Sequence, residues 1–130
     1  MTFSATPQTS LPRYTMKFNY NNKTFTSISN SGSGEVDGET RFSYKQTDNV
    51  LWATYSGGAI KFGTLTGLVH EDGSLDFRYS HVNRDDVIMT GCCLSTPEIL
   101  PDGRIQLHEK WQWTSGDMSA GESIVEELKL

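Results

Sequence analysis

The chain has 130 residues and a formal net charge of −5, with 11 Lys and Arg residues against 16 Asp and Glu residues. A chain of this length fits one domain and can bury a hydrophobic core that needs no metal ion or disulfide bond to stabilise it. Its basic residues are scattered, which excludes the clustered positive charge that binding to nucleic acid phosphates requires. We therefore expect one soluble domain with no nucleic acid partner.

The sequence also indicates a cellular location. No apolar run approaches the length that spans a bilayer, and residues 1–16 lack the basic start and apolar run of a secretory signal peptide. The two cysteines, Cys92 and Cys93, are neighbours, and successive strand residues point to opposite faces, so a bond between them is disfavoured. We expect a cytoplasmic protein with reduced cysteines and no membrane partner.

Two regions differ in pattern. Residues 1–16 are polar and follow neither the strand period nor the helix period, which predicts a flexible N-terminal tail. In residues 17–130, short runs rich in β-branched and aromatic residues alternate with turn-forming clusters about every ten residues. This alternation of strand-like runs and turns is typical of an all-β domain, and it favours an antiparallel up-and-down barrel of about eight strands.

The first expected strand covers residues 17–29, with an interruption at Asn21-Asn22, and a loop over residues 30–38 follows it. Six hairpin turns come next along the chain, and each one sets the pairing register of the strands beside it. The residues that mark these turns are Asp48-Asn49, Ser56-Gly57-Gly58, Asp72-Gly73, Arg84-Asp85, Asp102-Gly103 and Asp117-Met118.

One of these connections decides which central residues face inward. A four-residue loop over residues 83–86 places Tyr79 and His81 on the inner face and makes Cys92 a small core residue. The alternation of inner and outer residues changes phase between Leu94 and Ile99, which predicts a β-bulge or a break near Pro97.

The last hairpin shows the clearest alternation. The inner-face residues of the run 105–113 are Ile105, Leu107, Glu109, Trp111 and Trp113. A turn centred on Asp117-Met118 then sets Glu109 opposite Glu126 and Trp111 opposite Ile124. Two carboxylates would thus face each other on a surface of Ile, Leu and Trp.

A pair of buried carboxylates needs a cation or a shared proton, because desolvation and mutual repulsion both disfavour the charged forms. The sequence therefore predicts a ligand cavity with Glu109, Glu126, His81, Tyr79 and Trp111. Two plainer interpretations stay open. The end of the barrel could be wet, or a one-residue slip of register could turn Glu126 outward.

Other chemistry finds less support in the sequence. His70, His81 and His108 lie on different expected strands at no metal-ligand spacing, so we expect no metal site and no cofactor. Neither cysteine has a recognisable His base. The Ser-Gly fragments at residues 56–58 and 115–117 lie in turns, outside the strand-turn-helix context of a nucleophilic serine.

Over residues 17–130 this strand pattern resembles the calycin-type barrels, which include lipocalins, fatty-acid-binding proteins and avidin. The lipocalin Gly-x-Trp motif is absent near the first strand. The block WATYSGGAIKFGTLTGLV, followed by STPEILPDGRIQLHEKWQWTSGD and GESIVEE, is similar to a small uncharacterised bacterial family often labelled N-acetylglutamate synthase. No motif here supports acetyltransferase activity, since the coenzyme A turn Arg/Gln-x-x-Gly-x-Gly/Ala is missing.

We therefore expect a binding protein whose barrel encloses a small, largely apolar ligand, with its polar group recognised by Glu109, His81 or Tyr79. One alternative is an enzyme that uses Glu109 or Glu126 as a general acid or base. Another is a structural or interaction domain with a filled interior, whose sheet edge or tail pairs with a second copy of the chain.

Overall fold

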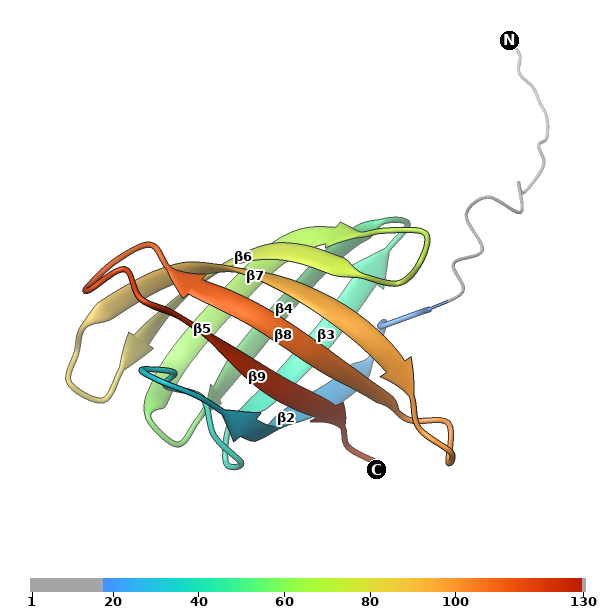
Figure 1. The fold of residues 1–130 in the computed structure, drawn as a ribbon, viewed down its shortest axis with the longest axis horizontal. Helices are drawn as coiled ribbons and strands as arrows, with labels where there is room; N and C mark the ends of the chain where they lie inside the picture. Colours follow the sequence, from blue (N-terminus) through green and yellow to red (C-terminus); the bar gives the residue numbers. More distant parts are fainter. Residues whose placement is uncertain (1–17, 130) are drawn as a thin grey trace, which may run out of the picture.

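The computed structural model describes residues 18–129, so the expected tail lies outside the described residues. Eight strands form one closed antiparallel barrel (Figure 1), in which each strand pairs with the next along the chain and β9 returns to β2. The strands are β2 (Lys23–Asn30), β3 (Arg41–Thr47), β4 (Val50–Gly57), β5 (Ile60–Val69), β6 (Leu75–Asn83), β7 (Ile88–Ile99), β8 (Ile105–Trp113) and β9 (Ala120–Glu127). The predicted all-β up-and-down barrel is confirmed. Within residues 18–129 no helix has the length and apolar character needed to cross a membrane.

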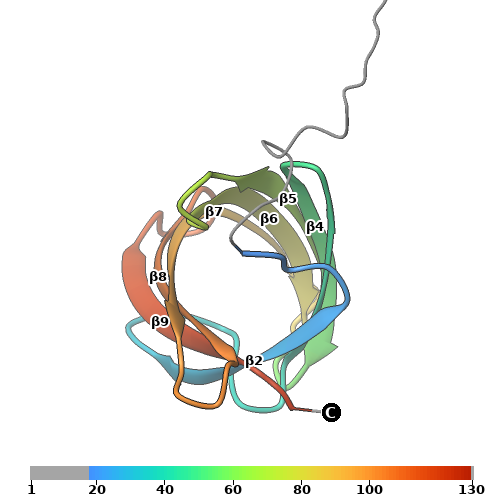
Figure 2. The ribbon, with the colours of Figure 1, turned by 90° about the vertical axis from the view of Figure 1, so that its right-hand side faces the viewer.

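The two ends of the barrel are built differently. One end, at the left of Figure 1, carries the connections β2–β3, β4–β5, β6–β7 and β8–β9, and we call it the loop end. The other end faces the viewer in Figure 2, where the segment before β2 crosses the mouth of the barrel. In that segment the Tyr20 ring is fully buried, and its hydroxyl donates to the Gly73 carbonyl at 2.6 Å. Tyr20 therefore plugs this end.

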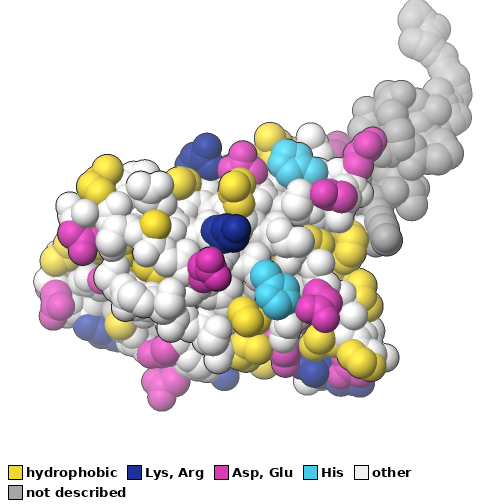
Figure 3. All heavy atoms as spheres, viewed as in Figure 1, with side chains coloured by type: hydrophobic (Ala, Val, Ile, Leu, Met, Phe, Trp, Pro, Cys, Tyr) yellow, Lys and Arg dark blue, Asp and Glu magenta, His cyan; other side chains and the backbone are white. Residues whose placement is uncertain are grey.

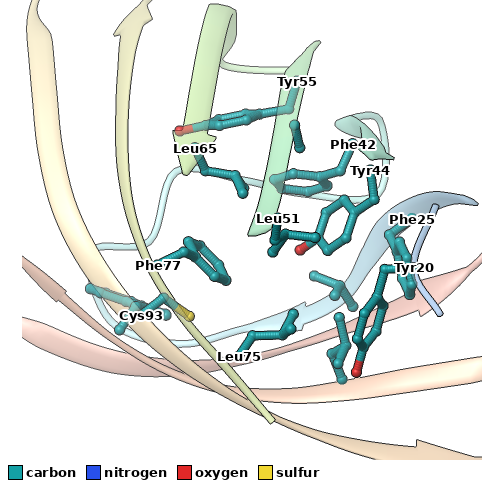
Figure 4. Packing of buried hydrophobic residues seen from close by; sticks show 14 of the residues in the cluster. Tyr20, Phe25, Phe42, Tyr44, Leu51, Tyr55, Leu65, Leu75, Phe77 and Cys93 are labelled. Atoms are coloured by element: carbon teal, nitrogen blue, oxygen red, sulfur yellow. The ribbon is translucent and has the colours of Figure 1, made fainter. Parts of the chain in front are cut away.

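Alternation along the strands separates the interior from the surface. In β8 the inner-face residues predicted from the sequence are all buried, and those between them are exposed or half-buried. The face of the molecule shown in Figure 3 carries charged side chains of both signs with hydrophobic ones between them. Inside, aromatic and aliphatic side chains pack across the barrel (Figure 4), as at Phe25 and Tyr44, whose ring centroids are 4.6 Å apart.

The register between β6 and β7 differs from the prediction by one residue. Tyr79 pairs with Gly91, and Cys93, not Cys92, is the buried cysteine. The reason is the turn: Asp86 adopts a φ of 60°, so the connection is a three-residue loop with Asp where glycine is usual. In this register the alternation of inner and outer residues continues through β7 to Ile99. β7 therefore pairs with β8 without interruption, and the predicted bulge or break near Pro97 is wrong.

The register between β8 and β9 differs by three residues. Glu109 pairs with Ser123, while Glu126 pairs with Gln106 on the outer face. The connection is centred on Gly116 and not on residues 117–118, because Gly116 and Met118 both adopt a φ of 63°. The prediction that the two glutamates face each other is therefore wrong, and so is the inward position of Ile124, whose place in the core is taken by Val125.

Candidate functional site

A cavity lies inside the barrel toward the loop end. The centre of a water-sized sphere can move through about 50 Å³ of it. Since one water needs about 10–15 Å³ by this measure, the cavity accommodates roughly three to five water-sized groups. The aromatic rings that line it are those of Phe42, Tyr44, Tyr55, Phe77, Tyr79, Trp111 and Trp113.

The β2–β3 loop, residues 31–40, covers this cavity. The Trp111 indole N–H donates to Asn30 Oδ1 at 3.1 Å, and the Trp113 indole N–H donates to Ser33 Oγ at 3.1 Å. The Asn30 amide in turn donates to the Val36 carbonyl. Two tryptophans of β8 therefore hold the loop over the site.

A chain of polar groups links the interior to the same loop. The Tyr55 hydroxyl lies 2.9 Å from His81 Nδ1, and His81 Nε2 lies 2.9 Å from Glu35 Oε1. His81 is only 3% exposed, and this burial lowers its pKa although Glu35 acts in the opposite direction. Burial also raises the pKa of Tyr55. The partners thus assign a neutral imidazole that accepts from Tyr55 and donates to Glu35.

Glycines in neighbouring strands make room for these rings. A Cβ on Gly63 would lie 2.4 Å from the Tyr55 ring and 2.7 Å from His81 Cβ, so a larger residue would displace both side chains. A Cβ on Gly121 would likewise lie 2.3 Å from the Trp111 ring. The aromatic wall therefore depends on glycine at these strand positions.

Glu109 lies deeper in the barrel and borders the cavity. Glu109 is 8% exposed, and its two carboxyl oxygens accept hydrogen bonds from Ser95 Oγ at 2.9 Å and Ser123 Oγ at 3.1 Å. Burial raises the pKa of Glu109, and the hydroxyl donors oppose this shift only in part. No lysine or arginine of the described chain lines the cavity, so this carboxyl group has no cationic partner there.

Two phenolic hydroxyls in the cavity wall are available to a bound molecule. Neither Tyr44 nor Tyr79 has a hydrogen-bond partner for its hydroxyl within residues 18–129, although every fully buried polar side-chain atom there has one. Both hydroxyls therefore border accessible space. Figure 4 shows the Tyr44 oxygen directed toward the barrel interior.

The structure brings together four of the five site residues predicted from the sequence. Glu109, His81, Tyr79 and Trp111 all line the cavity. Glu126 does not, because it lies on the outer surface, where the Arg104 guanidinium donates to it at 2.7 Å. That these residues bind a ligand stays a prediction.

Sequence reasoning missed several polar groups of this site. Glu35 lies in a long loop whose path no local pattern predicts, and Tyr55 meets His81 only because β4 and β6 both pair with β5. The predicted β8–β9 register, with Ile124 facing inward, turns the neighbouring Ser123 outward, whereas Ser123 is buried in the structure. The glycines opposite inward aromatics are a signal in the sequence that could have marked the aromatic wall. Within the described part of the chain, no three His, Cys, Asp or Glu side chains come together as metal ligands.

An antiparallel eight-strand barrel that closes on itself and holds a cavity at one end defines a calycin-type barrel. A family model described as "Avidin-like protein" matches residues 18–128, so the chain belongs to the avidin-like family. Members of this family typically bind small ligands such as biotin. A search of curated protein sequences gave no match. The predicted calycin-like resemblance is thus confirmed, while the bacterial source and the cytoplasmic location stay predictions.

Proposed function

We propose that this protein binds a small, largely apolar molecule with a polar group in the cavity at the loop end of the barrel. The observation that carries the proposal is the partly open cavity of about 50 Å³ with aromatic walls, to which Tyr44 and Tyr79 contribute hydroxyls that have no hydrogen-bond partner within residues 18–129. Apolar walls supply affinity, and a few convergent polar groups fix the orientation of a ligand. Membership of a family of ligand-binding barrels supports the same conclusion.

The β2–β3 loop sets the size of the ligand. A molecule of a few atoms fits beneath the closed loop, whereas a molecule as large as biotin requires the loop to move outward. Such a movement breaks the bonds from Trp111 to Asn30 and from Trp113 to Ser33. The two indole N–H groups therefore report on occupancy and on opening of the loop.

The other two functions considered from the sequence receive less support. A filled structural domain is disfavoured by the cavity, and pairing through a free sheet edge is disfavoured because the barrel is closed. A general acid carries a proton to donate, whereas both oxygens of Glu109 accept hydrogen bonds from serine hydroxyls. This arrangement favours binding over catalysis.

The proposal is tested by titrating ¹⁵N-labelled protein with biotin and with two small neutral probes, urea and tert-butanol. We expect at least one probe to cause saturable shifts of the Trp111 and Trp113 indole N–H signals. Trp52 lies on the outer face and is 41% exposed, so its indole signal is the internal control. Shifts confined to Trp52, or no saturable shift with these or with charged probes of similar size, would contradict the proposal.

A matched pair of variants of β5 locates the binding site. Leu65 lines the cavity, and Leu65→Phe is expected to reduce probe binding at least about tenfold because the added ring occupies the space. Leu68 lies on the outer face with 46% exposure, and Leu68→Phe should leave the dissociation constant unchanged. Equal dissociation constants for the two variants would place binding outside the barrel. Thermal unfolding of both variants confirms that they fold.

A further inference from the structure

The cavity has acidic side chains without basic ones beside them. Two carboxyl groups, those of Glu35 and Glu109, border it, and no lysine or arginine of residues 18–129 does. The lysines and arginines that form ion pairs, such as Arg104 with Glu126, lie away from the cavity. His81 supplies no compensating charge, because burial lowers its pKa and keeps the imidazole neutral.

Aromatic rings line the same space. Trp113 is central to this arrangement, with its ring centroid 5.6 Å from that of Trp111, 5.8 Å from that of Tyr79 and 5.7 Å from that of His81. The face of an aromatic ring carries negative electrostatic potential, so a ring whose face borders the cavity attracts a cation bound there. The aromatic rings and a carboxyl group without a cationic partner therefore both favour a positively charged ligand group.

The hydrogen bonds of Glu109 are consistent with a preference for a cationic ligand group. Its partners, Ser95 and Ser123, are neutral hydroxyls, so they orient the carboxyl group without neutralising a negative charge. Burying a carboxylate without a cation is unfavourable, and a cation bound nearby would offset this cost. The carboxyl group and the rings come from β3, β4, β6 and β8, so they enclose the cavity from several sides.

From these observations we infer that the molecule bound at the proposed site presents a small organic cation, an alkylammonium or guanidinium group, to Glu109 and the surrounding aromatic rings. This inference rests on the proposed function and names its ligand class. The space of about 50 Å³ sets the size of the cationic group at roughly three to five non-hydrogen atoms. Guanidinium and tetramethylammonium fall within this range.

The test uses pairs of probes that match in shape and differ in charge. Guanidinium is compared with urea, and tetramethylammonium with tert-butanol, at constant ionic strength, by following the Trp111 and Trp113 indole signals. In at least one pair we expect the cation to bind about tenfold or more tightly than its neutral partner. Glu109→Gln should reduce this preference to within about twofold. Glu126→Gln, which changes a carboxylate on the outer face, should leave it unchanged.

Each outcome decides the inference. If in both pairs the neutral probe binds as tightly as its cation or more tightly, the inference is overturned while the proposed function stands. If no probe shifts the two indole signals, both fail. Cation preference that survives in Glu109→Gln overturns the assigned role of Glu109. The comparison of matched probes needs only the unmodified protein, so it remains decisive even if Glu109→Gln does not fold.

Discussion

Tyr20→Ala is expected to lower the free energy of unfolding by about 3–5 kcal/mol, the range for truncating a large buried aromatic side chain. Tyr20 is fully buried, and its ring lies 6.2–6.4 Å from those of Phe18, Phe25 and Tyr44, measured between centroids. Alanine would leave a cavity at the plugged end of the barrel. Chemical denaturation at 25 °C measures the loss.

Tyr20→Phe is the matched control for this change. It keeps the ring and removes only the hydroxyl that donates to the Gly73 carbonyl, so we expect a loss of about 1–3 kcal/mol. If Tyr20→Ala is no more destabilising than Tyr20→Phe, the ring does not plug the barrel as described. Because Tyr20 lies at the end opposite the loop end, folded Tyr20→Phe should keep the parent's probe affinity.

The second large effect concerns Glu109 and pH. Burial raises the pKa of Glu109 in the folded state above its unfolded value of about 4.3. The folded state therefore holds its proton more firmly, and the resulting stabilisation is complete below about pH 4.3. It is lost as the pH rises through the folded pKa, at about 1.4 kcal/mol for each pH unit that separates the two values.

Glu109→Gln should remove this pH dependence, because glutamine has no proton to lose. Above the folded pKa of Glu109 the variant is therefore expected to be more stable than the parent protein. Cys93, Tyr44 and Tyr55 also face Glu109, but burial raises the pKa of each, so all three keep their protons in the range tested. Glu35, from the β2–β3 loop, remains unchanged in both proteins.

Denaturation curves collected from pH 4 to pH 8 for the parent and for Glu109→Gln measure this difference. The control is Glu126→Gln, which removes an outer-surface carboxylate paired with Arg104 and should retain the parent's loss of stability above about pH 4.3. Identical pH profiles for the parent and Glu109→Gln would mean that Glu109 titrates as an exposed carboxyl group does, and the buried site would lose its electrostatic basis.

The amino-acid sequence by itself determined the all-β class, the order of the strands and the inward face of β8. These features depend on local physics: the two-residue period of a strand, and turns such as Asp72-Gly73 and Asp102-Gly103, in which glycine adopts the positive φ that the turn requires. The burial of Glu109, Trp111 and His81 could be predicted for the same reason.

Only the tertiary structure decided the two registers and the composition of the site. Asp86 and Met118 adopt positive φ values that their residue types do not predict, and each moves a strand relative to its neighbour. One shift carries Glu126 to the outer face and brings Ser123 to Glu109. The hydrogen bond between Glu35 and His81 joins residues that are 46 positions apart in the sequence. Such contacts form only when the barrel closes, because closure sets which side chains share its interior.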